Sequence, residues 1–318
     1  MTDRLSRRVF LGRSATSAMG GFLALSALSA TSQYKYASRL GFQAYTVRDL
    51  LMTTAASTLQ RISSIGYREM ELYDPAHAVN LVPLAAANGL HVVGSHLPDL
   101  FATDRAWLDW RAAGEPAVPA GFDLDGILAI AQHHSLFLLG YASGAPKSAY
   151  SSEADYRAFV RLLDRIGARC RAVGASFIYH NHCREFELIG SRTYFDVIAE
   201  NSDPEHVAFE VDVCWAAQAG VDPSALISKL GRRVLAIHLK DRRAAVDASP
   251  LTEMSTENER RIVAEVGRGV LDIPGILTAA HGARVRNVIV EQDFTPADPV
   301  ASLAASYSYV RKLGLSYG

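Results

Sequence analysis

The sequence has few cysteines and lacks a glycine-rich nucleotide-binding motif, two features that often identify the class of a protein. Only three of its 318 residues are cysteine, at positions 170, 183 and 214. Their spacing fits neither a zinc motif nor a disulfide framework, so three separate buried thiols are expected. One bridge between Cys183 and Cys214 is conceivable in an oxidising compartment. No Gly-x-Gly-x-x-Gly follows the first expected strand, which argues against a dinucleotide-binding loop.

A large net charge is also lacking. The formal net charge of the chain is −1 at pH 7. The first thirty residues carry four arginines and one aspartate, so without them the net charge is −4. This balance gives no electrostatic reason to expect nucleic acid as a partner. After residue 30 no stretch is apolar and long enough to cross a membrane.

The first thirty residues have the layout of a removable export signal. Residues 6–11 read SRRVFL, which is typical of a twin-arginine signal, and a mildly apolar stretch rich in Ala, Ser and Gly follows at 15–30. That stretch is too short and too polar to be a good membrane anchor. We therefore expect residues 1–30 to be read by the twin-arginine export machinery. Residues 31–318 are then the mature chain, outside the cytoplasm, in the periplasm of a bacterium with two membranes.

Apolar runs alternate with amphipathic stretches along the rest of the chain. Eight runs predict strands at 40–45, 69–73, 90–96, 136–141, 177–179, 207–212, 234–238 and 288–291. Helical periodicity predicts helices at 50–65, 82–87, 123–133, 153–173, 223–230, 273–280 and 299–313. Segments 97–122 and 242–265 are predicted insertions, the first lying over the barrel mouth. The alternation and the length together predict an α/β fold consisting of a single (β/α)₈ TIM barrel.

The stretch 177–187, FIYHNHCREFE, is the most informative part of the chain. Three strand-forming apolar residues end in His180, Asn181 and His182. Strand side chains alternate, so His180 and His182 lie on the same side. In a parallel barrel such strand ends form the active-site face. Two imidazoles there can share a metal or a substrate, although two structural histidines would look the same.

Polar residues follow the apolar part of the other expected strands as well. They are Gln43, Glu71, His96, Asp212, His238 and Glu291. Strands five to eight thus supply imidazole, carboxylate, imidazole and carboxylate at one face of the barrel. A mixed nitrogen and oxygen set of this kind suits Mn²⁺, Zn²⁺, Co²⁺ or Fe²⁺. The sequence therefore predicts a divalent metal site at the carboxyl ends of the strands.

Three further residues have two interpretations each. Lys240 shares the inward alternation of His238 and could hold an anionic or enolate oxygen, or it could pair with Asp241 in a loop salt bridge. Trp215 and Tyr141 could stack on the apolar face of a sugar ring, or they could simply pack at the rim. Residues 267–269, Gly-Arg-Gly, are assigned to a loop.

At this point the chain resembles the sugar phosphate isomerase/epimerase family, the xylose isomerase-like TIM barrels, and within it the YHNH branch. The resemblance covers residues 40–313. The motifs that carry it are GFQAYTVR at 41–48, IGY at 65–67 with Glu71, YHNH at 179–182 with Glu185 and Phe186, EVDVCW at 210–215 with Ala219 and Gly220, HLKD at 238–241, VGRG at 266–269 and EQDF at 291–294. These motifs identify the family and the branch, not a substrate.

The resemblance implies a divalent metal, often Mn²⁺, at the barrel mouth. Carried over residue by residue, its ligands are His180, Asp212, His238 and Glu291. Many members have glutamate at the strand-five position, and two facing glutamates then move a proton on either face of a keto sugar. Here that position is His180, so a single-base reaction fits better, such as isomerisation or β-elimination from a 3-keto sugar.

We therefore expect a metal-dependent enzyme, isomerase- or epimerase-like, that abstracts a proton next to the carbonyl of a free sugar or keto sugar. The proton acceptor would be Glu291 or Glu185, with His182 beside the metal. Lys240 or His96 would donate to the enolate oxygen or the departing group. Gln43, Glu71, Trp215 and Tyr141 are the expected substrate-binding residues.

Other functions remain open on sequence alone. A 3-keto-glycoside lyase or hydrolase would use the same residues. A non-catalytic periplasmic carbohydrate-binding protein would have kept the barrel and lost the chemistry. An endonuclease shares the barrel, but the acidic mature charge and the export signal oppose it. A homo-oligomer is possible.

Overall fold

The computed structural model describes residues 39–101, 103–115, 118–243, 256–295 and 298–313. The predicted export signal at residues 1–30 lies outside these ranges. Within them, no helix is long and apolar enough to span a membrane.

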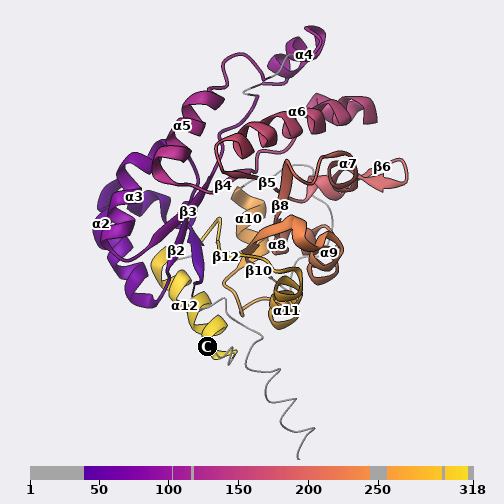
Figure 1. The fold of residues 1–318 in the computed structure, drawn as a ribbon. Helices are drawn as coiled ribbons and strands as arrows, with labels where there is room; N and C mark the ends of the chain where they lie inside the picture. The colour runs from indigo at the N-terminus through magenta and orange to yellow at the C-terminus, as the bar shows by residue number, and fades with distance from the viewer. Residues whose placement is uncertain (1–38, 102, 116–117, 244–255, 296–297, 314–318) are drawn as a thin grey trace, which may run out of the picture.

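Eight parallel strands close into a barrel in the order β1-β12-β9-β8-β5-β4-β3-β2 (Figure 1). They are β1 (Gly41–Gln43), β2 (Glu69–Leu72), β3 (His91–His96), β4 (Leu138–Tyr141), β5 (Ser176–His180), β8 (Val207–Asp212), β9 (Val234–Leu239) and β12 (Asn287–Val290). Each predicted strand is present, with ends within two residues of those expected. The predicted (β/α)₈ TIM barrel is therefore confirmed.

Helices surround the barrel and connect its strands. They are α2 (Arg48–Ile65), α3 (Ala78–Ala87), α5 (Leu124–His134), α6 (Glu153–Ala172), α7 (Tyr194–Asn201), α8 (Val213–Gln218), α9 (Pro223–Leu230), α11 (Ile273–Ala283) and α12 (Pro299–Lys312). Several begin at an aspartate that caps the first turn. Asp222 and Asp298 each accept from the backbone and precede a proline at the first helical position. Helix α7, between β5 and β8, was not predicted.

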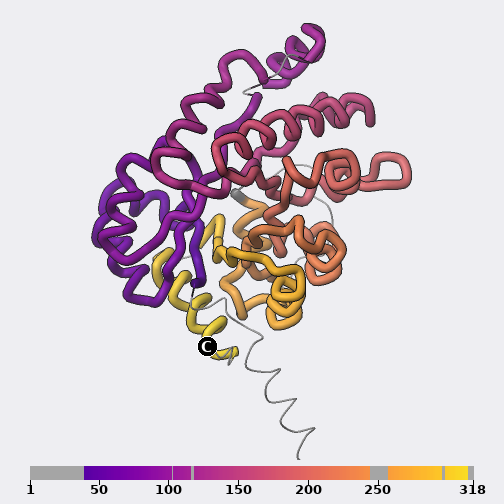
Figure 2. Tube along the Cα trace, viewed as in Figure 1, coloured from indigo at the N-terminus to yellow at the C-terminus, as the bar shows by residue number. Residues whose placement is uncertain are grey.

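The ring closes where the last helix packs beside the first. The Tyr67 hydroxyl donates to the Leu303 carbonyl at 3.0 Å, and Tyr307 lies against Gly66, where an added Cβ would be 2.1 Å from its hydroxyl oxygen. Gly66 also has a φ of +128°, so only glycine suits this position. Figure 2 shows the indigo and yellow ends of the described chain side by side.

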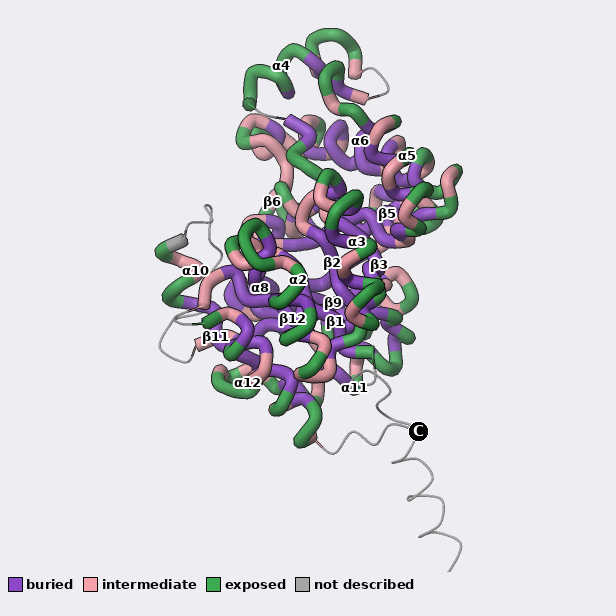
Figure 3. The backbone as a smooth tube through the Cα atoms, turned by 90° about the vertical axis from the view of Figure 1, so that its left-hand side faces the viewer, coloured by how far each residue is buried: buried purple, intermediate pink, exposed green. Residues whose placement is uncertain are grey.

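The first insertion, residues 97–122, does not lie over the barrel mouth as predicted. Its first residue, Leu97, lines the barrel mouth, but its helix α4 (Asp104–Ala112) packs against α6. Arg111 pairs with Asp155 at 3.1 Å, and the Arg165 guanidinium lies 5.3 Å from the Trp110 ring centroid. Figure 3 shows α4 beyond the barrel, largely exposed.

The second insertion reaches the mouth. Its ends are joined by an antiparallel pair, β10 (Asp241–Arg242) and β11 (Val263–Ala264), and it contains α10 (Thr256–Ile262). A short hairpin of β6 (Leu188–Ile189) and β7 (Arg192–Thr193) follows the β5 tip.

The barrel interior is layered from bottom to top. At the amino-terminal end Glu69 accepts from Arg39 at 2.8 Å and from Asn287 at 2.7 Å. Side chains of Leu138, Ile178 and Ala236 form an apolar layer above this. Alternation along β9 then places His238 above Ala236, and Lys240 follows at the carboxyl end. The polar residues of the sequence analysis therefore lie on the active-site side of an apolar floor.

Candidate active site at the barrel mouth

His238 is the central residue of the polar layer. Its Nδ1 lies 2.7 Å from Glu291 Oε2, and its Nε2 lies 2.8 Å from Glu71 Oε2 and 3.2 Å from Glu210 Oε2. The side chain is completely buried. Burial alone would lower the pKa of His238, but Glu210 and Glu291 raise it well above its usual range. The ring thus has a carboxylate on each side.

Glu210 gathers three imidazoles around one carboxylate oxygen. Its Oε2 lies 2.9 Å from His96 Nε2, 3.1 Å from His180 Nδ1 and 3.2 Å from His238 Nε2. Burial would raise the pKa of Glu210, but these imidazoles, His238 foremost, hold it well below its usual range. Burial and the charge of His238 lower the pKa of His180. Burial would lower the pKa of His96 too, but Glu71 and Glu210 raise it.

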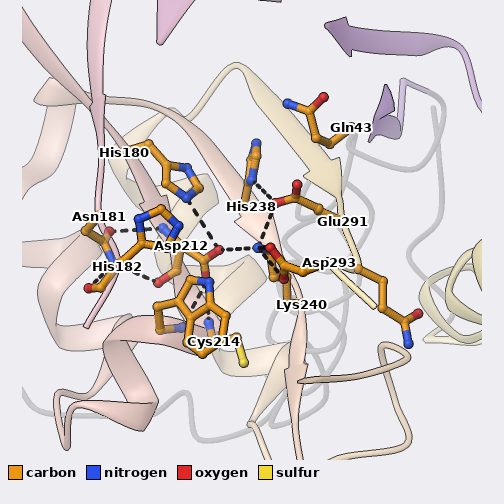
Figure 4. Close-up of polar contacts among 12 residues, drawn as sticks. Gln43, His180, Asn181, His182, Asp212, Cys214, His238, Lys240, Glu291 and Asp293 are labelled. Atoms are coloured by element: carbon orange, nitrogen blue, oxygen red, sulfur yellow. Dashed lines mark hydrogen bonds and ion pairs between the residues drawn. The ribbon is translucent and has the colours of Figure 1, made fainter. Parts of the chain in front are cut away.

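Lys240 is a second centre of contacts, nearer the mouth (Figure 4). Its ammonium lies 3.0 Å from Asp212 Oδ2, 2.7 Å from Glu291 Oε2 and 2.8 Å from Asp293 Oδ2. Burial would lower the pKa of Lys240, but the three carboxylates raise it well above its usual range. Lys240 is therefore a fixed cation, and these are its partners, not Asp241.

The Asp241 carboxylate instead holds the neighbouring loop. It accepts from the backbone amides of Arg242, Gly267, Gly269 and Leu271, at 2.8 to 3.0 Å. A Cβ at Gly269 would be 2.2 Å from this carboxylate, so glycine is required there. The Gly-Arg-Gly segment is thus a loop, as expected, and it is bound to the end of β9.

The residues fit a divalent cation. Five carboxylates of this region are buried: Glu71, Glu210, Asp212, Glu291 and Asp293. Burial raises the pKa of Asp212 to about 6 and also raises those of Glu71 and Asp293. Glu71 Oε1 and Glu210 Oε1 are buried without a hydrogen-bond partner. An excess of buried negative charge and unpaired oxygens costs free energy, which a bound cation would offset.

Two overlapping sets of side chains could hold such an ion. His96, His180, Glu210 and His238 form one set, and Asp212, His238 and Glu291 form the other. The predicted ligands are thus divided: three fall in the second set, and His180 falls in the first. His180 Nε2 still lies 3.7 Å from Asp212 Oδ2. His238 belongs to both sets.

A cavity of about 350 Å³ opens above these residues, a size suited to a small-molecule ligand. Its lining is mostly polar: Gln43, Tyr45, Tyr73, His96, Leu97, Ala142, Ser143, His180, His182, Glu259, Glu291 and Asp293. A larger cavity of about 500 Å³ lies beside α4, but its lining, which includes Leu100, Trp110 and Phe122, is largely apolar and contains no imidazole. The cavity that adjoins the imidazoles and carboxylates is therefore the one at the barrel mouth.

The YHNH motif holds the β5 tip in place. Asn181 exchanges hydrogen bonds with the backbone of Asp212, accepting from its amide at 3.0 Å and donating to its carbonyl at 3.2 Å. His182 faces the cavity, and burial and the charge of Lys240 lower its pKa to about 3. Its imidazole is therefore neutral.

Glu185 lies behind the β5 tip, not in the cavity lining. Its oxygens accept from the Tyr179 hydroxyl at 2.7 Å and from the His182 amide at 3.1 Å. This placement favours positioning His182 over accepting a proton from a substrate.

Two expected sugar-stacking residues are in the core instead. Tyr141 and Trp215 are both 0% exposed. The Tyr141 hydroxyl donates to the Gly144 carbonyl at 2.9 Å, and Lys240 lies 5.6 Å from the Trp215 ring centroid. Neither ring faces the cavity, because neighbouring side chains cover both. Of the two interpretations, packing against neighbouring side chains fits the structure, and stacking on a sugar ring does not.

Gln43 and Glu71 do lie at the site. Gln43 lines the cavity and its Nε2 donates to Glu71 Oε2 at 2.8 Å. Glu71 contacts other side chains of the site and is 0% exposed. Gln43 is therefore placed to contact a substrate, and Glu71 to position Gln43 and His238.

Three acidic residues of the site were not predicted. Glu210 is two positions before Asp212, so strand alternation places it on the same face. Asp293 is two positions after Glu291. Glu259, on α10, lines the cavity, and burial raises its pKa. Nothing in the pattern of the second insertion marked Glu259.

None of the three cysteines forms a disulfide, and all are buried. Cys183 and Cys214 share a small apolar cluster with Trp215, Ile262 and Val263. The expectation of three separate thiols is confirmed.

Comparison with known proteins supports the fold. No family model matches this chain. The inosose dehydratase of Mesomycoplasma hyopneumoniae strain J is 26% identical over 176 residues, which are 52% of this chain and 56% of that protein. The chain thus spans about half the length of such curated relatives.

Solved structures match over nearly the whole chain. A sugar phosphate isomerase/epimerase from Parabacteroides distasonis ATCC 8503 has a TM-score of 0.68 at 19% identity and covers 88% of this chain and 96% of its own. The probable 3-DHS dehydratase AsbF from Bacillus anthracis has a TM-score of 0.63 at 13% identity and covers 86% and 98%. At these identities the likeness establishes the fold alone.

Proposed function

We propose that this chain is a metal-dependent, sugar isomerase/epimerase-like enzyme that removes the proton next to a carbonyl group of a free sugar or keto sugar. The observation that supports this most directly is the convergence of imidazoles, buried carboxylates and a lysine beneath one polar cavity. The polar lining suits a substrate rich in hydroxyl groups.

The metal would be held at the barrel mouth by residues drawn from the two sets that share His238. The ligands implied by the family resemblance are His180, Asp212, His238 and Glu291. When bound, a divalent cation supplies Lewis acidity that makes the C–H next to a carbonyl more acidic.

The chain's own groups supply the rest of the reaction. His182 and Glu291 both line the cavity. His182 is placed to accept the proton, whereas Glu291 Oε2 is held by His238 and Lys240 at 2.7 Å and is less suited to do so. The ammonium of Lys240 adds a fixed positive charge that stabilises a developing enolate oxygen. Glu185 keeps His182 in position through the backbone amide.

Elimination of water is a second candidate outcome of the same first step. It is favoured by the dehydratase names of the relative and of one structural neighbour. The site also favours it, because the strand-five position is His180 and a symmetric pair of bases is not expected. Glu259 lines the cavity with a raised pKa, so it is suited to hold a proton for a departing hydroxyl.

The test is turnover of ketoses, inososes and 3-keto glycosides in deuterated water, with and without added metal. We expect metal-dependent deuterium at the carbon next to the carbonyl, or a primary isotope effect with substrate labelled there. Product analysis then separates isomerisation from elimination. Binding without turnover in every metal would show a carbohydrate-binding protein instead.

We further propose that the protein acts outside the cytoplasm, on the basis of the SRRVFL segment. Replacing Arg7 and Arg8 by lysine should retain the protein in the cytoplasm, because the twin-arginine route reads both residues. Normal export of the double variant, measured by cell fractionation, would contradict this.

A further inference from the structure

The barrel mouth contains two cation places, one on each side of the His238 ring. We propose that the divalent metal occupies the deeper place, bound by His96, His180, Glu210 and His238, and that Lys240 permanently fills the outer one. This inference rests on the proposed function, because it defines the metal site of that enzyme. It also departs from the ligand set that the family resemblance implies.

The outer place is already filled by a charge of the protein. Three carboxylates, from Asp212, Glu291 and Asp293, lie 2.7 to 3.0 Å from the Lys240 ammonium. Lys240 is 0% exposed, so solvent does not compete for these contacts. A metal ion at this place would have to displace a buried ammonium group that contacts all three carboxylates.

The deeper place has the spacing of a coordination sphere. Glu210 Oε2 lies 2.9, 3.1 and 3.2 Å from nitrogens of His96, His180 and His238. With bonds of about 2.0 to 2.1 Å, tetrahedral ligand atoms lie about 3.3 Å apart and adjacent octahedral ones about 2.9 Å. All four ligand atoms of this set lie within 4.8 Å of one another.

Two buried oxygens without a hydrogen-bond partner lie at the deeper place, and a third, Asp212 Oδ2, lies 3.0 Å from the Lys240 ammonium. Glu210 Oε1 and Glu71 Oε1 are buried without a hydrogen-bond partner, and such groups usually have one. The Glu71 side chain contacts His238 Nε2 at 2.8 Å and lies 3.5 Å from His96 Nε2. A cation among the three imidazoles would be close to both carboxylates.

The orientation of His238 is compatible with the deeper place. Its Nδ1 lies 2.7 Å from Glu291, and Lys240 holds the same Glu291 oxygen at 2.7 Å. Metal-binding histidines commonly donate their other ring N–H to a carboxylate, which fixes the ring and the tautomer. In this arrangement Glu291 is a positioning residue, and His238 Nε2 is the nitrogen that faces the metal.

Three imidazoles and one carboxylate favour a transition metal over Mg²⁺ or Ca²⁺. Zn²⁺ is therefore a suitable probe, and X-ray absorption of the full Zn²⁺-loaded protein counts its imidazole ligands. We expect three. The outer set offers one imidazole, or two if His180 joins it, so the count separates the two places without any substitution.

A matched pair of variants sharpens the test. His96→Gln removes a deep ligand and should lower the count to two and weaken Zn²⁺ binding by more than about 100-fold, beyond the range of a positioning residue. Asp212→Asn keeps the oxygen that caps α8 and should retain three imidazoles. Circular dichroism confirms that both are folded.

Each outcome of this experiment supports or overturns the deeper metal site. A count of three imidazole ligands in the wild-type protein that drops to two in His96→Gln supports it. The deeper site is overturned if the wild-type protein shows two or fewer imidazole ligands and if tight Zn²⁺ binding is retained in His96→Gln and lost in Asp212→Asn. In that case metal-dependent turnover of a sugar would still support the proposed function. A three-imidazole site without turnover of any sugar would leave the site standing and remove the proposed function. Absence of Zn²⁺ binding overturns the proposed site.

Discussion

Two glutamates on strand β2 show how the ends of the barrel interior differ. Glu69 and Glu71 are two residues apart, face the same side and are both buried. Both oxygens of Glu69 have partners, Arg39 and Asn287. Glu71 instead has an unpaired oxygen, and burial raises its pKa.

The difference separates a buried carboxylate whose hydrogen-bond partners are complete from one whose partners are not. At the closed end, a buried carboxylate comes with enough donors to satisfy it, and it stabilises the fold. At the mouth, carboxylates outnumber the cations that could pair with them. Such unmet charge is costly to the fold, and it is expected where a ligand completes the site. The predictions below test this contrast, from the largest expected effect to the smallest.

His238→Ala should have the largest effect, because this residue belongs to both candidate metal sets. We expect activity to fall about 1,000-fold or more, together with loss of bound metal measured by elemental analysis. Asn287→Ala, at the closed end, is the matched control and should keep activity per folded molecule. Full metal occupancy in the His238 variant would remove the proposed site.

His182→Ala should separate proton transfer from metal binding. We expect activity to fall about 100-fold, the lower range for a lost general base, with metal content unchanged. Gln43→Ala is a suitable comparison, because it should raise KM more than it lowers kcat. If the His182 variant loses its metal, the strand-five ligand is His182 and not His180.

The pH dependence of stability should reveal the cost of burying a carboxylate at the mouth. The pKa of Asp212 is raised to about 6 in the folded protein, above about 3.9 in an unfolded chain. The folded state then holds a proton that the unfolded state releases. The free energy of unfolding of metal-free protein should therefore fall as pH rises from about 4 to about 6, by up to about 3 kcal/mol from this residue. Denaturation in the presence of a chelator measures this, and a fall equally steep in Asp212→Asn would contradict it.

Exchanging each β2 glutamate for glutamine tests the contrast itself. Glu69→Gln places an amide group against the donors of Arg39 or Asn287 and should cost about 1 to 3 kcal/mol of unfolding free energy. Glu71→Gln can turn its amide toward the unpaired side, so we expect a change of less than about 1 kcal/mol, with weaker metal binding. Equal losses of stability would show that the two ends do not differ.

Tyr141→Phe should have the smallest effect. It removes the hydroxyl that donates to Gly144 and keeps the packed ring, so we expect a loss of about 1 kcal/mol of stability. Turnover should be unchanged, because the ring is buried away from the cavity. A marked rise in KM would restore Tyr141 as a substrate-binding residue.

Much of the fold was predictable because a parallel barrel places simple requirements on sequence. Its strands are buried on both faces and appear as apolar runs, and polar residues directly after such runs must share one face. That reasoning found His180, His238 and Glu291 together. It could not predict α7, which is short and follows an irregular hairpin.

The layer of the barrel that a side chain reaches was harder to predict than the side of the strand that it faces. Alternation tells which side a residue faces, but not which layer it reaches. Glu210 was missed because it lies within an apolar run, although it has the same parity as Asp212. Tyr141 and Trp215 were placed at the rim because burial of aromatic rings depends on neighbours from other strands. The partner of Lys240 was ambiguous for the same reason.

The pairing of β10 with β11 has a consequence for how this protein can change over evolution. The two ends of the second insertion are hydrogen-bonded to each other, Asp241 opposite Ala264, and the Asp241 carboxylate ties the following loop to the same point. Doubling the length of a loop between fixed ends costs only about 0.6 kcal/mol. Homologous segments of different length and composition can therefore be exchanged between Arg242 and Val263, replacing Glu259 at the cavity while the barrel beneath keeps its charges in place.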